Sequence, residues 1–452
     1  MTRSLLAALA LLAACPGPDT AVDTDPGTSG TDPDTGTARP AWTASLLAEV
    51  DGGQQLRLTA TAEGQLLAAW FANTPVSDGI CDEIAANPPE RLRYPLMAAL
   101  GGPDAWAVEE VARPVVALTP TGLDLAVDPS GAPVIAFTGG TPQGQYCGGN
   151  DAVVATRGSG GAWAQVTAAS ESGESNTGLP ASDAGFVVGH WPALAFDPAG
   201  HAAVLHRDVH YGALQRDDEY RADAELAWSS GSGWSHEAVD AGQGAGAYGQ
   251  LRFAADGQPV AVYVVPIQGT GEQRLGVWAS KRATDGTWAR VQLHAGQVGQ
   301  EVAVDLSPAG VLSVAFYSAD DLEPRLRRLT DLTRLDDPSA WTNERVGTAL
   351  YDEGAAISIA RLPDERLALS YHRCKRAADN ADTCDANEEA VVVALEDGSS
   401  WTHEVAYRGA YGACGGYTSL AVAGAELFVA FQCTDQVDGA FVVRPWLARR
   451  PL

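Results

Sequence analysis

Polar residues that could bind a ligand follow several apolar segments of the sequence. They are Arg, Asp, His and Tyr side chains, namely His206, Arg207, Asp208, Tyr317, Asp320, His372, Arg373, Arg408 and Tyr411. Arginine binds carboxylates through paired hydrogen bonds, and Asp, His and Tyr exchange hydrogen bonds with hydroxyl groups. We predict these residues as ligand-binding candidates and assign no catalytic residue.

No catalytic or metal-binding motif accompanies these residues. Neither GxSxG nor HExxH occurs, and the glycine-rich run at 158–161 lacks the strand-to-helix setting of a phosphate loop. Four of the eight histidines crowd one region with spacings that straddle a turn: His190, His201, His206 and His210. We therefore expect no metal site and no cofactor, and structural calcium has no supporting motif.

A repeated unit must position the candidate residues, and its clearest copy is LDLAVDPSGAPVIAF at 123–137. Each copy predicts a strand, a tight turn and a second strand. The copies begin at residues 56, 123, 192, 251, 302, 357 and 418. A third strand-like run follows each copy, and a Trp then opens a fourth, alternating one. Each repeat therefore contains four strands.

Seven repeats of four antiparallel strands, at a period of roughly 40 to 60 residues, are typical of a seven-bladed β-propeller. A sandwich would not repeat seven times, and a β-helix has a far shorter period. The segment at 42–50 has the Trp-led pattern of a fourth strand, and the last strand-like run of the chain has the pattern of a third strand. We predict that these two strands pair in the last blade and close the ring, so that no sheet edge stays open.

Loop lengths distinguish the two faces of the predicted ring. The turns between first and second strands are short, as at 129–131. The opposite face, here called the long-loop face, carries longer connections at 72–90, 138–150, 168–190, 207–221 and 373–388. Because long loops on a rigid scaffold commonly bind ligands, we predict that this face is functional.

The N-terminus carries an export signal rather than a folded element. Residues 1–14 combine Arg3 with a short apolar run, and Leu12-Ala13-Ala14-Cys15 resembles the bacterial lipobox, in which the Cys is lipidated. An ordinary secretory signal is the alternative. Residues 15–40 are rich in Thr, Asp, Gly and Pro, which predicts a disordered acidic tether, and residues 41–452 form the propeller. We expect an exported protein anchored to the cell envelope, at the outer membrane if the organism is Gram-negative.

Six cysteines remain after Cys15, which in an exported protein suggests three disulfides. Fifteen pairings are possible. Their positions in the predicted blades favour Cys81 with Cys147, Cys374 with Cys384, and Cys414 with Cys433.

The charge of the chain restricts its partners. Lys and Arg total 29 against 57 Asp and Glu, which gives a net charge of −28. A polyanion such as nucleic acid would be repelled at long range. We expect a monomer that associates with the membrane only through its lipid anchor.

The repeats resemble those of bacterial exported propellers with the blade pattern SLAxDxxGxPxxAF, here at 125–133. The segment SKRATDGTW at 280–288 resembles the Asp-box turn of sialidases, although Ala283 occupies the place of its usual Ser. The resemblance to exported propellers implies the fold from Trp42 onward.

We predict a lipoprotein that binds a glycan or protein ligand through the long-loop face. The alternatives are a sialidase-like glycoside hydrolase or polysaccharide lyase acting at the mouth of the ring, and a structural envelope component.

Overall fold

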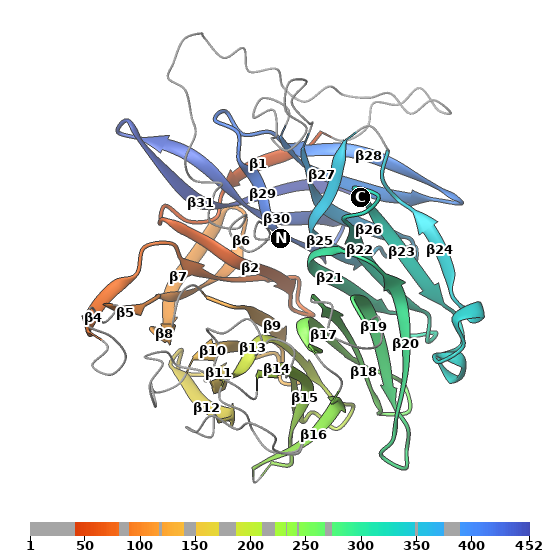
Figure 1. Cartoon of the computed structure of the whole chain (residues 1–452). Coiled ribbons are helices and arrows are strands. Elements are labelled where there is room, and N and C mark those ends of the chain that lie inside the picture. The colour runs from red at the N-terminus through yellow and green to blue at the C-terminus, as the bar shows by residue number, and fades with distance from the viewer. Residues whose placement is uncertain are drawn as a thin grey trace. The chain divides into compact units, whose positions relative to one another are not determined.

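Seven four-stranded antiparallel sheets form a ring of blades in the computed structural model, which confirms the predicted seven-bladed propeller (Figure 1). The structure describes residues 41–80, 90–116, 120–139, 151–170, 187–209, 222–231, 233–241, 244–266, 274–348, 351–374 and 389–452. The signal at 1–14, Cys15 and the tether at 15–40 lie outside these ranges. Within the described residues, no helix is long and apolar enough to cross a membrane.

Blades 1 to 4 follow one another along the chain, with their strands in sequence order. Blade 1 contains β2 (Gly52–Ala60), β3 (Leu66–Ala72), β6 (Leu96–Gly102) and β7 (Ala105–Ala112). Blade 2 contains β9 (Leu123–Val127), β10 (Pro133–Gly139), β11 (Asp151–Arg157) and β12 (Trp163–Ala169). Blade 3 contains β13 (Val187–Phe196), β14 (Ala202–Val209), β15 (Ala222–Ser229) and β16 (Trp234–Asp240). Blade 4 contains β17 (Ala247–Phe253), β18 (Pro259–Val265), β19 (Gly276–Arg282) and β20 (Trp288–Ala295).

Blades 5 to 7 complete the ring. Blade 5 contains β21 (Val298–Leu306), β22 (Leu312–Ser318), β23 (Glu323–Leu329) and β24 (Thr342–Arg345), with the short 3-10 helices Leu332–Arg334 and Pro338–Ala340 before β24. Blade 6 contains β25 (Asp352–Arg361), β26 (Leu367–Cys374), β27 (Ala390–Asp397) and β28 (Ser400–Tyr407). Blade 7 contains β29 (Cys414–Ala423), β30 (Glu426–Val437), β31 (Ala440–Pro451) and β1 (Thr43–Leu46).

The two ends of the domain pair as predicted. Strand β1 lies antiparallel to β31, with Thr43 opposite Arg449 and Leu46 opposite Trp446. Blade 7 is therefore built from both ends of the domain. The observed strand is shorter than the predicted one at 42–50, because the chain after Leu46 bends into the interface between blades, where Leu47 is buried.

Over the seven blades, the second strands contribute the largest share of the buried apolar residues. In β18 every residue is buried, and in β10 all but the first are. These strands lack the polar and apolar alternation of a half-exposed strand because a neighbouring blade covers each of their faces. The turns before them are tight: Asp128 accepts hydrogen bonds from the backbone N–H groups of Ser130 and Ala132 through Oδ1, both at 2.8 Å. This turn therefore serves the scaffold.

Two features extend or correct the predicted loops. The predicted loop at 72–90 contains β4 (Val76–Ile80), which pairs with β5 (Glu90–Arg93), and β5 pairs with β8 (Val115–Val116) in a separate three-stranded sheet. Its strands are short and partly polar, so no apolar run signals them. The disulfide Cys414–Cys433 is confirmed, and Cys374 is disulfide-bonded to a partner outside the described residues. Cys81, Cys147 and Cys384 lie outside those residues too.

Candidate ligand site at the axial mouth

The first strands of the seven blades contact one another around the ring and line a cavity of about 440 Å³. Pockets for small ligands commonly measure roughly 300 to 1,000 Å³. The lining of this axial cavity combines apolar residues with a few charged or amide side chains: Arg57, Asp124, Gln250, Arg252 and Glu301. A cavity of this size and polarity can hold a hydroxylated ligand.

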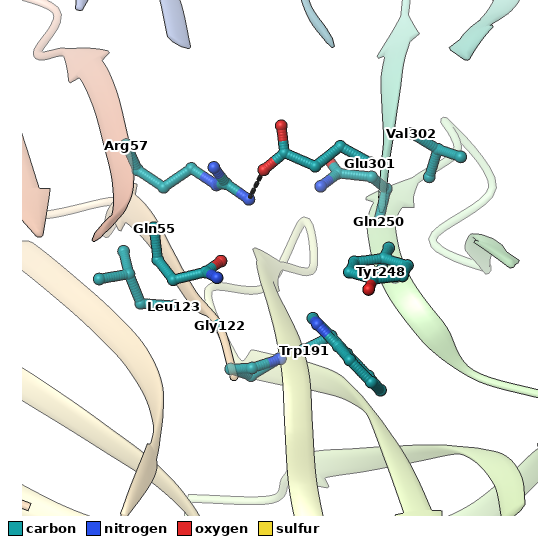
Figure 2. A pocket seen from close by; sticks show the side chains of 11 residues that line it. Gln55, Arg57, Gly122, Leu123, Trp191, Tyr248, Gln250, Glu301 and Val302 are labelled. Atoms are coloured by element: carbon teal, nitrogen blue, oxygen red, sulfur yellow. Dashed lines mark hydrogen bonds and ion pairs between the residues drawn. The ribbon is translucent and has the colours of Figure 1, made fainter. Parts of the chain in front are cut away.

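A second pocket of only about 20 Å³ shares Arg57, Gln250, Glu301 and Val302 with this cavity, and we call it the axial mouth. It is lined by Gln55, Arg57, Gly122, Leu123, Trp191, Pro192, Tyr248, Gly249, Gln250, Glu301 and Val302 (Figure 2). These residues lie near the starts of their strands. Since each tight turn after a first strand lies on the opposite face, the axial mouth opens on the long-loop face.

One position of the repeat supplies the mouth from several blades. It lies just before the repeated unit in six blades and three residues before it in blade 4: Gln55, Gly122, Trp191, Tyr248, Glu301, Ala356 and Tyr417. Five of them are non-glycine residues with φ between 48° and 58°, namely Gln55, Trp191, Tyr248, Ala356 and Tyr417. In each of these five strands the pairing register shifts at that point. A β-bulge redirects the side chain it carries, and such bulges are common beside functional sites.

Two aromatic rings form one wall of the mouth. The ring centroids of Trp191 and Tyr248 lie 4.6 Å apart with an interplanar angle of 48°. The guanidinium of Arg207 lies 5.5 Å from the centre of the Trp191 ring. This contact supports the indole from outside the pocket, because Arg207 does not line the pocket itself. The aromatic wall is therefore held in place by neighbouring strands.

An ion pair crosses the ring beside this wall. Arg57 of blade 1 donates a hydrogen bond from Nη2 to Oε1 of Glu301 of blade 5 at 3.1 Å, and Figure 2 shows the two side chains reaching towards each other. The other oxygen of Glu301, Oε2, has no hydrogen-bond partner among the described residues. Burial raises the pKa of Glu301, and the attraction of Arg57 only partly opposes this shift. A buried carboxylate with a shifted pKa in a pocket is typical of a functional site.

The other polar groups of the cavity mainly tie neighbouring blades together. Asp124 accepts backbone hydrogen bonds from Leu194 through Oδ2 at 2.8 Å and from Leu125 through Oδ1 at 2.9 Å, and burial raises its pKa. Ser419 accepts a similar bond from Leu58 at 2.9 Å. Each oxygen of Asp124 already accepts one backbone hydrogen bond, whereas Oε2 of Glu301 accepts none among the described residues, so Glu301 is the more available carboxylate.

Arginines in the cavity do not form a free cluster. Arg57 is paired with Glu301, and Arg252 donates to the carbonyl oxygens of Leu251 and Val304 at 2.7 and 2.8 Å. Among the described residues no third arginine lines the cavity. The described part of the cavity therefore contains two arginines, each already bonded within the fold.

The residues predicted from the sequence lie elsewhere. None of the nine lines the cavity or the axial mouth as far as the described residues define them. On β14, His206 and Asp208 are fully buried and Arg207 is 3% exposed. Tyr317 donates to Asp352 at 2.5 Å, and Asp320 accepts from the backbone of Gln297 at 3.3 Å. These groups therefore make contacts within the fold.

The remaining predicted residues are equally dispersed. His372 Nε2 lies 3.9 Å from Glu389, the guanidinium of Arg373 lies 4.4 Å from the Tyr351 ring, and Tyr411 packs edge-on against Phe441. Arg408 is exposed. Most of the nine lie on second strands or the turns after them, one layer out from the first strands that line the axis. Comparing the residue before each repeated unit is the sequence signal that points to the mouth.

Comparisons with known proteins leave the family open. No protein-family model matches the sequence, and no curated protein matches it. A Dyadobacter fermentans protein of unknown function is similar in structure at 11% identity, with 91% of this chain and 98% of that chain covered and a TM-score of 0.45. The Hadza microbial sialidase Hz136 gives 12% identity, coverage of 89% and 66%, and a TM-score of 0.41. AofleA from Arthrobotrys oligospora has 10% identity, with 84% of this chain and 94% of that chain covered and a TM-score of 0.43.

Proposed function

We propose that this propeller binds a carbohydrate in the axial cavity, with the axial mouth contacting one end of the ligand. The observation that carries the proposal is the Trp191–Tyr248 wall beside the Arg57–Glu301 pair. An aromatic ring offers a flat apolar surface for the C–H face of a sugar ring, while charged and amide groups bond its hydroxyls. Glu301 supplies a free acceptor through Oε2, and Gln250 adds an amide. The bulges that hold Trp191 and Tyr248 support a preformed site.

A glycoside hydrolase is the second candidate, because Asp124 and Glu301 both line the cavity and burial raises the pKa of both. Hydrolysis by the common mechanisms needs two carboxylates that act on opposite sides of the scissile bond. Both oxygens of Asp124 are held by backbone hydrogen bonds, so Asp124 is less free than Glu301 to move into position for catalysis. This difference favours binding over turnover.

Removing either ring of the aromatic wall is expected to weaken glycan binding. Trp191→Ala and Tyr248→Ala should each weaken the affinity for the bound glycan at least about 30-fold, the loss of a 2 kcal/mol contact. A glycan array would identify the sugar, and titration calorimetry would measure the affinities. Tyr411→Ala, which removes an aromatic ring 43% exposed elsewhere on the surface, should leave the affinity unchanged.

The same array distinguishes the two candidates. If the wild type hydrolyses a bound glycan and Glu301→Gln stops turnover, the hydrolase reading replaces the binding one. If no glycan binds, or if Trp191→Ala binds as tightly as the wild type while Tyr411→Ala does not, the axial mouth is not the site.

We infer further that the protein is exported and lipid-anchored, on the strength of the Leu12-Ala13-Ala14-Cys15 segment. Cys15→Ser should release the protein from the membrane fraction, because the Cys thiol is the group that would be acylated. Membrane fractionation and intact-mass measurement test this. If neither the wild type nor the variant carries lipid mass, and both distribute alike between the membrane and soluble fractions, the segment is an ordinary secretory signal instead.

A further inference from the structure

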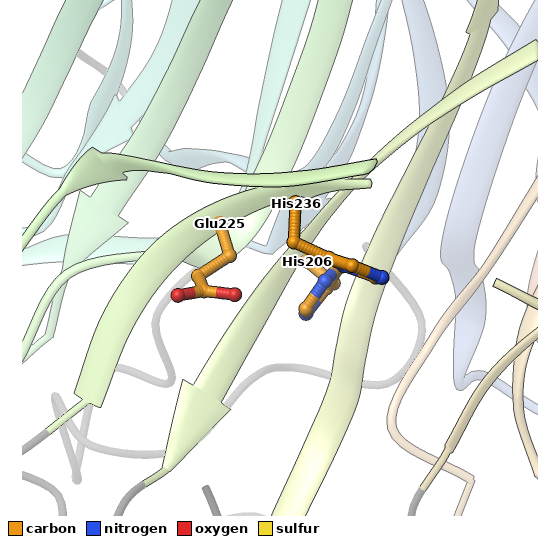
Figure 3. A group of neighbouring side chains, drawn as sticks. All are labelled: His206, Glu225 and His236. Atoms are coloured by element: carbon orange, nitrogen blue, oxygen red, sulfur yellow. The ribbon is translucent and has the colours of Figure 1, made fainter. Parts of the chain in front are cut away.

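Three side chains of blade 3 that could bind a metal lie together on one face of the blade. His206 in β14 pairs directly with Glu225 in β15, and Glu225 pairs with Ala238, two residues along β16 from His236. Since side chains alternate along a strand, all three leave the sheet on the same side. Figure 3 shows them projecting from neighbouring strands into one space, and one potential ligand atom of each lies within 4.8 Å of the others.

The face that carries them is the one packed against blade 2. Val204, Ala227 and Trp234, each two residues from one of the three in its strand, contact the apolar cluster between blades 2 and 3. His206 is 0% exposed and Glu225 is 3% exposed, while His236 reaches solvent. Two of the three side chains are therefore buried, and solvent reaches the group only from the side of His236.

The ring nitrogens of His206 are buried without a hydrogen-bond partner in the part of the chain that the structure describes. Neither Nδ1 nor Nε2 has a hydrogen-bond partner among the described residues, and both atoms are shielded from solvent. Buried polar atoms in folded proteins nearly always have partners, and a bound ion is one of the few explanations for an exception. The unpaired imidazole is directed into the same space as Glu225 and His236.

We propose that His206, Glu225 and His236 form a zinc site. Two imidazole nitrogens and one carboxylate oxygen are a recurrent zinc ligand set with three protein ligands and a fourth position for water. Calcium and magnesium prefer ligand sets made of oxygen, so they fit less well here. The exposed side at His236 gives the ion a path from solvent, and the net charge of −28 favours the approach of a cation.

The three ligand atoms must move slightly closer together to bind the ion. Zinc bonds of about 2.0 to 2.2 Å in a tetrahedron place ligand atoms roughly 3.3 Å apart, against separations of up to 4.8 Å here. Rotation of the exposed His236 side chain is the simplest way to close this gap. The bound ion would join β14, β15 and β16, and its fourth position would face solvent.

Calorimetric titration of tag-free, chelator-treated protein with zinc chloride tests the proposal. We expect one ion per chain in the wild type. His236→Ala and the isosteric Glu225→Gln should weaken binding at least roughly 10- to 100-fold, the loss seen when even an outer-shell partner of a metal is removed. His201→Ala is the matched control, because this exposed histidine of the same blade contacts Asp197 at 3.0 Å and lies outside the group.

Two results would overturn the proposal: no zinc uptake by the folded wild type, or equal affinity in wild type and His236→Ala. The exposed position of His236 means that its replacement should not disturb folding, which circular dichroism checks. Cobalt gives an independent readout, since a tetrahedral site with these ligands produces visible absorption bands that should disappear in both site variants and persist in His201→Ala. Bands retained in His236→Ala would also refute the site.

Discussion

Deletion of residues 41–50 is expected to destabilise the entire propeller. The deletion removes β1, exposes the hydrogen-bonding edge of β31 and empties the place of Leu47, which is 2% exposed between blades 7 and 1. Loss of one buried Leu side chain costs about 2 to 5 kcal/mol, and the lost strand ladder adds to this. Because the blades form a closed ring, the free energy of unfolding should fall for the whole domain by at least about 4 kcal/mol.

Urea unfolding monitored by tryptophan fluorescence measures this loss, and the matched control is a ten-residue deletion within the tether, 25–34. The control should unfold at the wild-type midpoint. A deletion of 41–50 that also keeps that midpoint would show that β1 contributes nothing to closure. Additional side-chain contacts argue against that outcome, since Trp42 donates to Glu404 at 2.9 Å and Arg450 bonds the same carboxylate at 3.0 Å.

The fold was predictable because it repeats. Seven copies of one pattern give seven chances to recognise a strand pair, and an error in one copy is corrected by the others. The closure followed from counting strands, since an unpaired third-type strand at the C-terminus needs a partner. The extra sheet of β4, β5 and β8 was not predictable in this way because it occurs once and β8 has only two residues.

The proposed axial site was harder to predict than the fold because it depends on backbone geometry. Trp191 and Tyr248 point into the axial mouth through φ angles of 48° and 51°, which an alternating pattern does not predict for bulky residues. The sequence drew attention to charged runs such as His206-Arg207-Asp208, where strand pairing directs side chains between blades. The sequence did not point to the proposed zinc group for a related reason: Glu225 and His236 come from strands other than that of His206, and only the register brings the three together.

Replacement of Glu301 by Gln is expected to separate ligand binding from stability. The substitution keeps the shape of the side chain and removes its charge. A hydrogen bond to a charged group contributes about 1.5 to 3 kcal/mol, so the affinity for the glycan should fall roughly 10- to 100-fold. The stability should stay the same or rise at neutral pH, because burial raises the pKa of Glu301 in the folded state despite the nearby Arg57.

The pH dependence of the free energy of unfolding should differ between the wild type and Glu301→Gln. A carboxyl group whose pKa is higher in the folded than in the unfolded state binds more protons when folded, so its contribution to stability falls as pH rises from about 4.3 through the folded pKa. Glu301→Gln removes that fall. The two proteins should therefore be closest in stability near pH 4, and the variant should be equal or superior at pH 7. Urea unfolding midpoints measured between pH 4 and pH 7 test this expected difference in stability.

A variant that is less stable at pH 7 but still binds the glycan would mean that the Arg57–Glu301 pair serves the scaffold and that the ligand is bound elsewhere.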